Sequence, residues 1–129
     1  MAKTFIIDAN NFSDLNGFYE EIGKKLTKAG WKSGRNLDAF NDILRGGFGN
    51  FEKGEAVTII WKDAAKSQKE LDHAQAAIYL NSMLERCHPQ NERRILTKIK
   101  DAKVGAGPTL YEMLKSVFTA HPHITFKTE

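Results

Sequence analysis

The chain has 129 residues, of which 41% are hydrophobic and 27% are charged, a balance typical of one globular domain. It contains no run of about 18 apolar residues, so no transmembrane helix is predicted. The opening MAKTFIIDAN has too short an apolar stretch for a signal peptide, and we therefore expect a cytoplasmic protein. The formal net charge is +3, and the single cysteine, Cys87, leaves no partner for an intrachain disulfide.

The N-terminal segment predicts a buried strand followed by an amphipathic helix. Residues 3–9 have a β-favouring centre, FII, and end in turn-forming residues. Ser13 is a candidate N-cap for the helix, and Gly30 is its candidate end. The apolar side chains between them follow the spacing of one helical face: Leu15, Phe18, Tyr19, Ile22 and Leu26.

A short second helix is predicted after Asn36, which is a suitable N-cap. On a helical projection its apolar side chains occupy one broad arc: Leu37, Ala39, Phe40, Ile43 and Leu44. The opposite arc is polar: Asp38, Asn41, Asp42 and Arg45. Because so short a helix is marginal by itself, packing of the apolar arc must hold it in place. The polar arc should then face solvent on a rigid support.

The polar arc carries charges that a purely structural helix would avoid. Asp38 and Asp42 lie four residues apart, where like charges repel by about 0.2–0.5 kcal/mol. Glycines follow at positions 46, 47 and 49. Such a bare backbone is typical of a flexible turn or of a place that a partner approaches closely. Trp31 and Phe48 flank the helix in loops, as core edges or as contact anchors, and the sequence leaves both interpretations open.

The remaining chain predicts alternating strands and helices. A near-continuously apolar strand over residues 56–62 is expected inside the sheet. Asp63 can cap a helix that runs to Leu71, and Thr109 can cap the last helix. Further helices are predicted over residues 74–87 and 91–103, and a closing strand over residues 123–129. Strands separated by helices favour parallel pairing, so the predicted fold class is α/β.

No motif in the chain predicts catalysis. Carboxylates four residues apart on an exposed helix stay solvated and ionise separately, which suits general acid–base chemistry poorly. The glycine-rich RGGFGNF matches no phosphate-binding pattern. His121 and His123 flank a proline that disturbs regular ligand spacing, and a single thiol makes a structural zinc site improbable. We expect no enzymatic activity, no metal site and no cofactor.

The most basic segment is residues 91–103, with five basic and two acidic side chains. Surfaces that bind nucleic acid usually combine a denser basic stripe with aromatic side chains, and this segment has no aromatic residue. A solvated helix face is therefore the favoured interpretation of these charges.

Residues 34–46, GRNLDAFNDILRG, resemble the barstar family, the intracellular inhibitors of barnase-type ribonucleases. Eight positions match the family pattern: Gly34, Asn36, Leu37, Asp38, Ala39, Asp42, Leu44 and Gly46. The resemblance covers residues 3–71 and returns at 109–128, and it implies a three-stranded parallel sheet flanked by helices. Residues 72–107 are then predicted to be a helical insertion within a single domain.

The resemblance also implies a partner-binding site. In the family, an acidic helix and the neighbouring loop fill the active site of a ribonuclease, with carboxylates in place of substrate phosphates. Asp42 matches the central acidic contact, Asp38 the supporting one, and Gly46 the position where the backbone approaches the partner. The full predicted site is Trp31, Lys32, Asp38, Asn41, Asp42, Arg45, Gly46 and Gly47. The chain differs from the family pattern at Lys32, Ser33, Arg35, Asn41 and Ser116.

The leading hypothesis is an inhibitor or immunity protein that occludes the active site of a ribonuclease or related toxin and is monomeric when free. The alternative is a barstar-like interaction module with a different protein partner, held partly by residues 72–107. A weaker third hypothesis is nucleic-acid binding through residues 91–103, which predicts a salt-dependent affinity. No association with membranes is expected.

Overall fold

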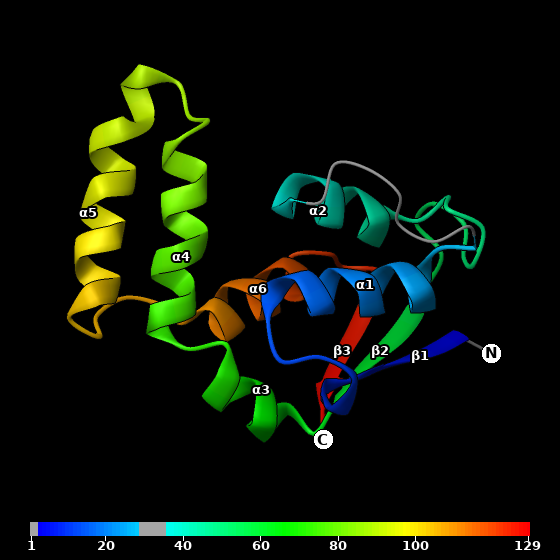
Figure 1. Cartoon of the computed structure of the whole chain (residues 1–129). Helices are drawn as coiled ribbons and strands as arrows, with labels where there is room; N and C mark the ends of the chain where they lie inside the picture. The colour runs from blue at the N-terminus through cyan, green and yellow to red at the C-terminus, as the bar shows by residue number, and fades with distance from the viewer. Residues whose placement is uncertain (1–2, 29–35) are drawn as a thin grey trace.

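The computed structural model describes residues 3–28 and 36–129. Its strands β1 (Lys3–Asp8), β2 (Val57–Lys62) and β3 (Ile124–Thr128) form one parallel sheet in the order β1-β2-β3 (Figure 1). Trp61 of β2 lies opposite Ile7 of β1 and Thr128 of β3. The predicted three-stranded parallel α/β fold is confirmed, and its near-continuously apolar strand is the central one.

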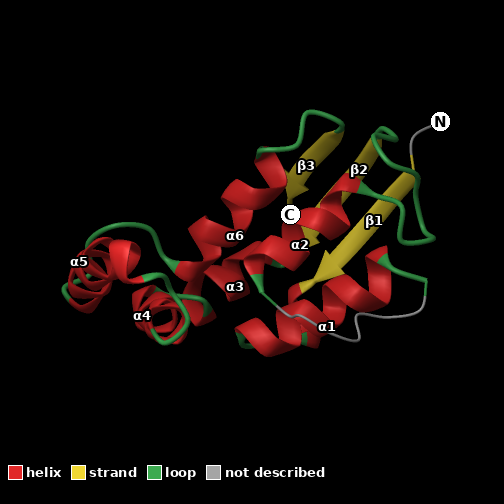
Figure 2. Cartoon of the chain, turned by 90° about the horizontal axis from the view of Figure 1, so that it is seen from above, coloured by secondary structure: helices red, strands yellow, loops and turns green. Residues whose placement is uncertain are grey.

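The helices cover one face of this sheet and extend beyond it. The elements are η1 (Ala9–Asn11), α1 (Leu15–Leu26), α2 (Leu37–Arg45), α3 (Ala64–Glu70), α4 (His73–Leu84), η2 (Pro89–Asn91), α5 (Glu92–Lys103) and α6 (Leu110–Thr119). Helices α1, α2 and α6 lie over the sheet (Figure 2). Helices α4 and α5 form a hairpin that projects away from it (Figure 1). Within the described ranges, no helix is both long enough and apolar enough to cross a bilayer.

The sheet buries one of its two faces. Along β2 the side chains of Val57, Ile59 and Trp61 are buried, whereas the alternate positions are partly or fully exposed. On the opposite face of β1, Ile6 remains 44% exposed. Successive side chains of a strand point to opposite faces, so the helices pack on the face that holds Ile7, Ile59 and Trp61.

Both ends of α1 differ from their predicted positions. The N-cap of α1 is Asp14 rather than Ser13, because the Asp14 side chain accepts a hydrogen bond from the Gly17 amide at 2.8 Å. The helix ends at Leu26, and Thr27 is extended because it forms a bridge with Gly49. The predicted end at Gly30 was therefore wrong, and Gly30 itself lies outside the described residues.

Of the two caps predicted for later helices, the side-chain cap at Asp63 is wrong and the cap at Thr109 is confirmed. Asp63 precedes α3 in a left-handed conformation with a φ of 56°, and its side chain makes no capping hydrogen bond. Thr109 caps α6 as predicted, in a reciprocal arrangement with Glu112. Residues 72–107 contain the α4–α5 hairpin and its connecting turns. That this segment is an insertion remains a prediction.

An aromatic cluster forms the centre of the core and holds α2. Trp61 is fully buried, and its Nε1 donates a hydrogen bond to Ser67 Oγ at 3.0 Å. The Phe18 ring stacks on Trp61 with a centroid distance of 5.2 Å. Phe40 of α2 packs edge-on against Phe18 at 5.3 Å and against Phe118 at 5.1 Å. These contacts join α2 to α1, α6 and the central strand.

Removal of this aromatic anchor should destabilise the fold. We predict that Phe40→Ala lowers the free energy of unfolding by about 3–5 kcal/mol, because it leaves a cavity among Phe18, Phe118 and their neighbours. Denaturant titration measures the change. Phe48→Ala is the control. Because Phe48 is 46% exposed, this substitution should lower the free energy of unfolding far less. Equal losses in the two variants would contradict the role given to Phe40.

Candidate functional site

Helix α2 presents the polar arc predicted from the sequence. Asn36 caps the helix as predicted, with its Oδ1 accepting a hydrogen bond from the Ala39 amide at 2.8 Å. Phe40, Ile43 and Leu44 are buried. Asp38 is exposed in the first turn, where a negative charge interacts favourably with the helix dipole. The buried residues thus orient the helix with its charged side chains outward.

Asp42 and Arg45 form an ion pair on the exposed side of α2. The distance between Arg45 Nη1 and Asp42 Oδ1 is 2.7 Å, and the two side chains are 60% and 58% exposed, respectively. An exposed pair of this kind contributes at most about 1 kcal/mol to stability. Asp42 is therefore accessible, but a neighbouring cation already offsets part of its charge.

Two histidines from the segment before β3 hold the C-terminal half of α2. His121 Nε2 lies 2.7 Å from Asn41 Oδ1, and His123 Nε2 lies 2.7 Å from the Leu44 carbonyl oxygen. Because a carbonyl oxygen can only accept, the Nε2 of His123 carries the proton. Asn41 thus belongs to the polar arc but is also engaged by His121. Sequence reasoning missed this role, since about eighty residues separate the partners.

The environment of His121 favours its neutral form. The residue is only 9% exposed, and burial is the main cause that lowers the pKa of its imidazole. The nearby charges of His123 and Arg45 lower this pKa further. A neutral ring with its proton on Nε2 can donate to Asn41 Oδ1.

The glycines after α2 are required by the chain's own loop. Gly46 is buried with a φ of 95°, and a Cβ atom at this position would collide with the carbonyl oxygen of Glu52. Gly47 is exposed, has a φ of 92°, and donates a hydrogen bond from its amide to the Phe51 carbonyl at 2.8 Å. The close approach at Gly46 is therefore an internal one, whereas the backbone at Gly47 is open to solvent.

The loop that follows is attached to the end of α1. The Lys28 amide donates to the Phe48 carbonyl at 3.0 Å, and Asn50 Nδ2 donates to the Lys25 carbonyl at 2.8 Å. The Phe48 ring itself stays 46% exposed, so it is not part of the core. Two predicted site residues, Trp31 and Lys32, lie outside the described residues, as do Ser33 and Arg35.

Comparison with known families identifies the chain. It matches the profile of the family described as Barstar (barnase inhibitor) over residues 2–101, which is 100 of its 129 residues. The chain belongs to the barstar family. The matched region begins at β1, includes all of α2 and reaches into α5. No curated protein and no solved structure showed significant similarity to the chain.

The structure brings together six of the eight predicted site residues of this barstar-family chain. Asp38, Asn41, Asp42 and Arg45 share the outer side of α2, and Gly46 and Gly47 follow directly at its end. Among residues 3–28 and 36–129, no three His, Cys, Asp or Glu side chains lie close enough together to hold a metal ion. His121 and His123, the candidate metal ligands, instead contact α2.

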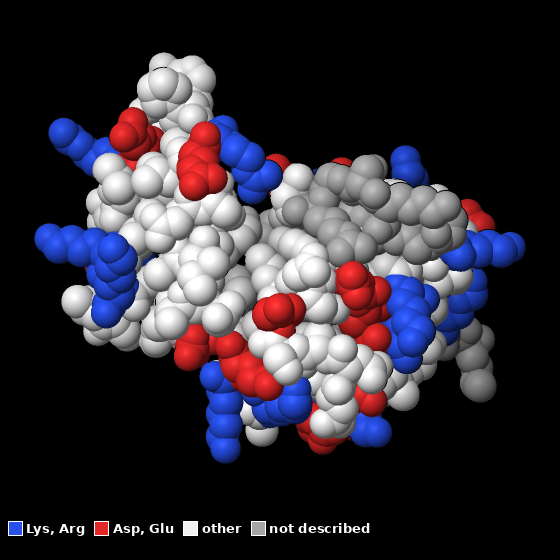
Figure 3. All heavy atoms as spheres, in the orientation of Figure 1, with Lys and Arg blue, Asp and Glu red and all other residues white. Residues whose placement is uncertain are grey.

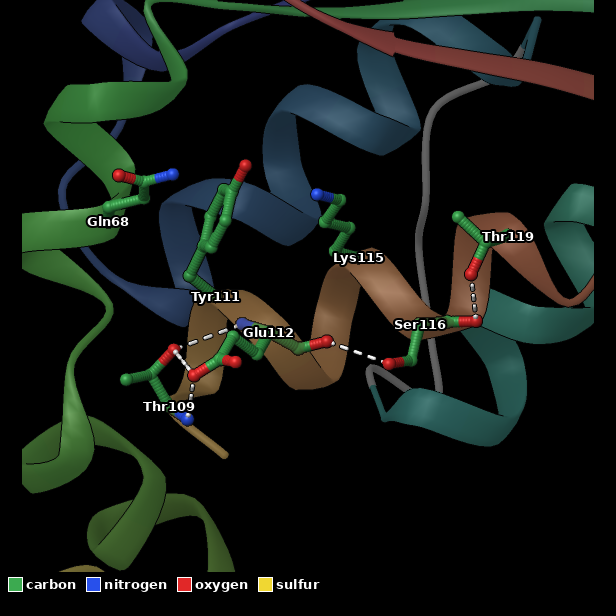
Figure 4. A pocket seen from close by; sticks show the side chains of 7 residues that line it. All are labelled: Gln68, Thr109, Tyr111, Glu112, Lys115, Ser116 and Thr119. Atoms are coloured by element: carbon green, nitrogen blue, oxygen red, sulfur yellow. Dashed lines mark hydrogen bonds between the residues drawn. The ribbon is translucent and has the colours of Figure 1, made fainter. Parts of the chain in front are cut away.

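Ser116 lies on α6 beside a separate hollow of about 510 Å³ (Figure 4). Its Oγ donates a hydrogen bond to the Glu112 carbonyl at 2.9 Å. The Glu112 carboxylate accepts hydrogen bonds from the backbone and side chain of Thr109, which lower the pKa of Glu112. Lys115 contributes a positive charge to the same hollow. The Glu112 carboxylate in this hollow is therefore already engaged in capping α6.

The His121 contact should make stability depend on pH. The folded state lowers the pKa of His121 below its usual value of 6.5, so the unfolded chain binds more protons as the pH falls through this value. We predict that the free energy of unfolding decreases between about pH 7 and about pH 5. Denaturant titrations across this range measure it. His121→Gln should flatten the dependence, and an unchanged slope in that variant would assign the effect to other groups.

Proposed function

We propose that this chain is an inhibitor or immunity protein that binds a ribonuclease or related toxin and occludes its active site through α2 and the following loop. One observation carries the proposal: an exposed pair of carboxylates, Asp38 and Asp42, on a helix that Phe40 anchors in the core of a barstar-family chain. Occlusion requires no catalysis by the chain itself.

The rigidity of α2 supports binding to a cationic active site. Ordering side chains and loops on association weakens binding, and a surface that is ordered beforehand avoids this cost. The cap at Asn36, the packing of Phe40 and the hydrogen bond of His123 to Leu44 all fix the helix before a partner arrives. Carboxylates held in this way can replace substrate phosphates against arginine and lysine side chains. Charge pairs at such interfaces couple by about 1.5–7 kcal/mol.

Ribonuclease inhibition tests this proposal directly. We would titrate the full chain into a panel of barnase-type ribonucleases that cleave a fluorogenic RNA. Inhibition of at least one enzyme is expected, and Asp42→Lys should weaken it by at least about a hundredfold, because it places like charges together. Glu129→Lys makes the same charge change at the far end of the sheet and should have no effect. Inhibition that survives Asp42→Lys, or a panel that is entirely unaffected, would contradict the proposal.

The ion pair within α2 leads to a second prediction. The positive charge of Arg45 offsets part of the negative charge of Asp42. Arg45 would also repel a cationic partner. We predict that Arg45→Ala raises the association rate constant a few-fold at low salt, measured by stopped-flow mixing with an inhibited ribonuclease. Arg93→Ala removes the same charge from α5, away from α2, and is the control. Equal gains in both variants would show an effect of net charge alone.

A further inference from the structure

The outer side of α2, which carries Asp38, Asn41, Asp42 and Arg45, is called the candidate face, and a second surface adjoins it. A cleft of about 500 Å³ lies between the N-terminal end of α2 and the α4–α5 hairpin, and the hollow between these parts is visible in Figure 3. Its apolar lining comes from several elements: Leu37, Leu80, Met83, Ile95 and Met113. Asp38 lines the cleft from the α2 side, so any protein that covers Asp38 also reaches the cleft.

The hairpin side of the cleft is positively charged. Arg86, Arg94 and Lys98 line it, and Arg94 and Lys98 are four residues apart on one side of α5. Among the residues that the structure describes, none of these three forms an ion pair. Arg86 Nε donates to the Ser82 carbonyl at 3.3 Å, which leaves its net charge uncompensated. Among the described residues that line the cleft, Asp38 on the opposite side is the only carboxylate, so the three cations outnumber the negative charges of the lining.

The positive charge of the whole chain is concentrated on this hairpin. Residues 73–103 carry six basic and three acidic side chains, so the formal net charge of +3 lies within them and the rest of the chain is neutral. Tyr79 in the cleft does not offset this charge. Burial, together with the nearby Asp38, raises the pKa of its phenol to about 12, so it stays neutral near pH 7.

We propose that the cleft binds an acidic segment with apolar side chains, supplied by the same partner protein that α2 engages. This inference rests on the proposed function and specifies its partner. The partner presents a basic site to Asp38 and Asp42 and, beside it, an acidic segment to Arg86, Arg94 and Lys98. Charge complementarity of this kind fixes the register of two proteins and disfavours partners with a uniform charge.

A protein segment fits the cleft better than a nucleic acid does. The apolar lining can bury leucine-like side chains, which a phosphate backbone lacks. Residues 91–103 contain no aromatic side chain on which a base could stack.

A peptide probe tests the cleft independently of any ribonuclease. The probe is a fluorescein-labelled peptide of glutamates with leucines four residues apart, titrated into the full chain and followed by anisotropy. Arg94→Glu/Lys98→Glu should weaken binding about tenfold, because it reverses two charges at the cleft. Arg93→Glu/Lys100→Glu is the matched control on the same helix, outside the cleft lining, and should weaken it much less. A probe with lysines in place of the glutamates should not bind.

Several results would overturn the inference. These are equal losses in the two double variants, no binding of the acidic probe, or tighter binding of a single-stranded oligonucleotide that depends on Arg94 and Lys98.

The same variants are then measured against a ribonuclease that the chain inhibits. If Asp42→Lys abolishes inhibition while Arg94→Glu/Lys98→Glu changes neither inhibition nor peptide binding, the cleft proposal fails and the proposed function stands. If Asp42→Lys has no effect on inhibition, the proposed function fails whatever the peptide does.

Discussion

The packing of Phe40 against Phe18 and Phe118 is the contact on which the candidate face depends. Helix α2 has nine residues, and a helix of this length is marginal in water without tertiary contacts. Its orientation is therefore set by the aromatic cluster that includes Trp61 of the central strand. Because the same cluster joins α1, α6 and the sheet, the exposed carboxylates of α2 are held by the whole core.

The contacts at the end of α2 serve the fold and the candidate face together. His123 satisfies the Leu44 carbonyl, one of the last-turn groups that lack a partner within the helix. Gly46 lets the chain turn against the Glu52 carbonyl, and the returning loop attaches to the end of α1. A substitution at Gly46 would thus disturb the fold, so a loss of binding in that variant would not identify Gly46 as a contact residue. For this reason Asp42, whose side chain is exposed, is the more informative position.

The distribution of charge suggests a partner of mixed polarity. The two carboxylates of α2 were expected to repel each other, but Arg45 pairs with Asp42 and reduces that repulsion. The formal net charge of +3 lies on the α4–α5 hairpin, across a cleft from Asp38. Net charge is therefore a poor guide to steering here, because two regions of opposite sign lie next to each other.

By itself the sequence determined the strands, the helices, the α/β class and the caps at Asn36 and Thr109. These features depend on side-chain periodicity and on hydrogen bonds between residues three or four apart. Local patterns were less reliable at Asp14, where two neighbouring residues could both serve as caps, and at Asp63, where the backbone is left-handed. The sequence also indicated the polar arc of α2, since its periodicity separates buried from exposed positions. Only the tertiary structure decided that His121 contacts Asn41, that Gly46 meets Glu52, and that a basic cleft adjoins Asp38. Those contacts join residues that are distant in the chain or lie in separate elements. Only the packing of the complete core brings them together.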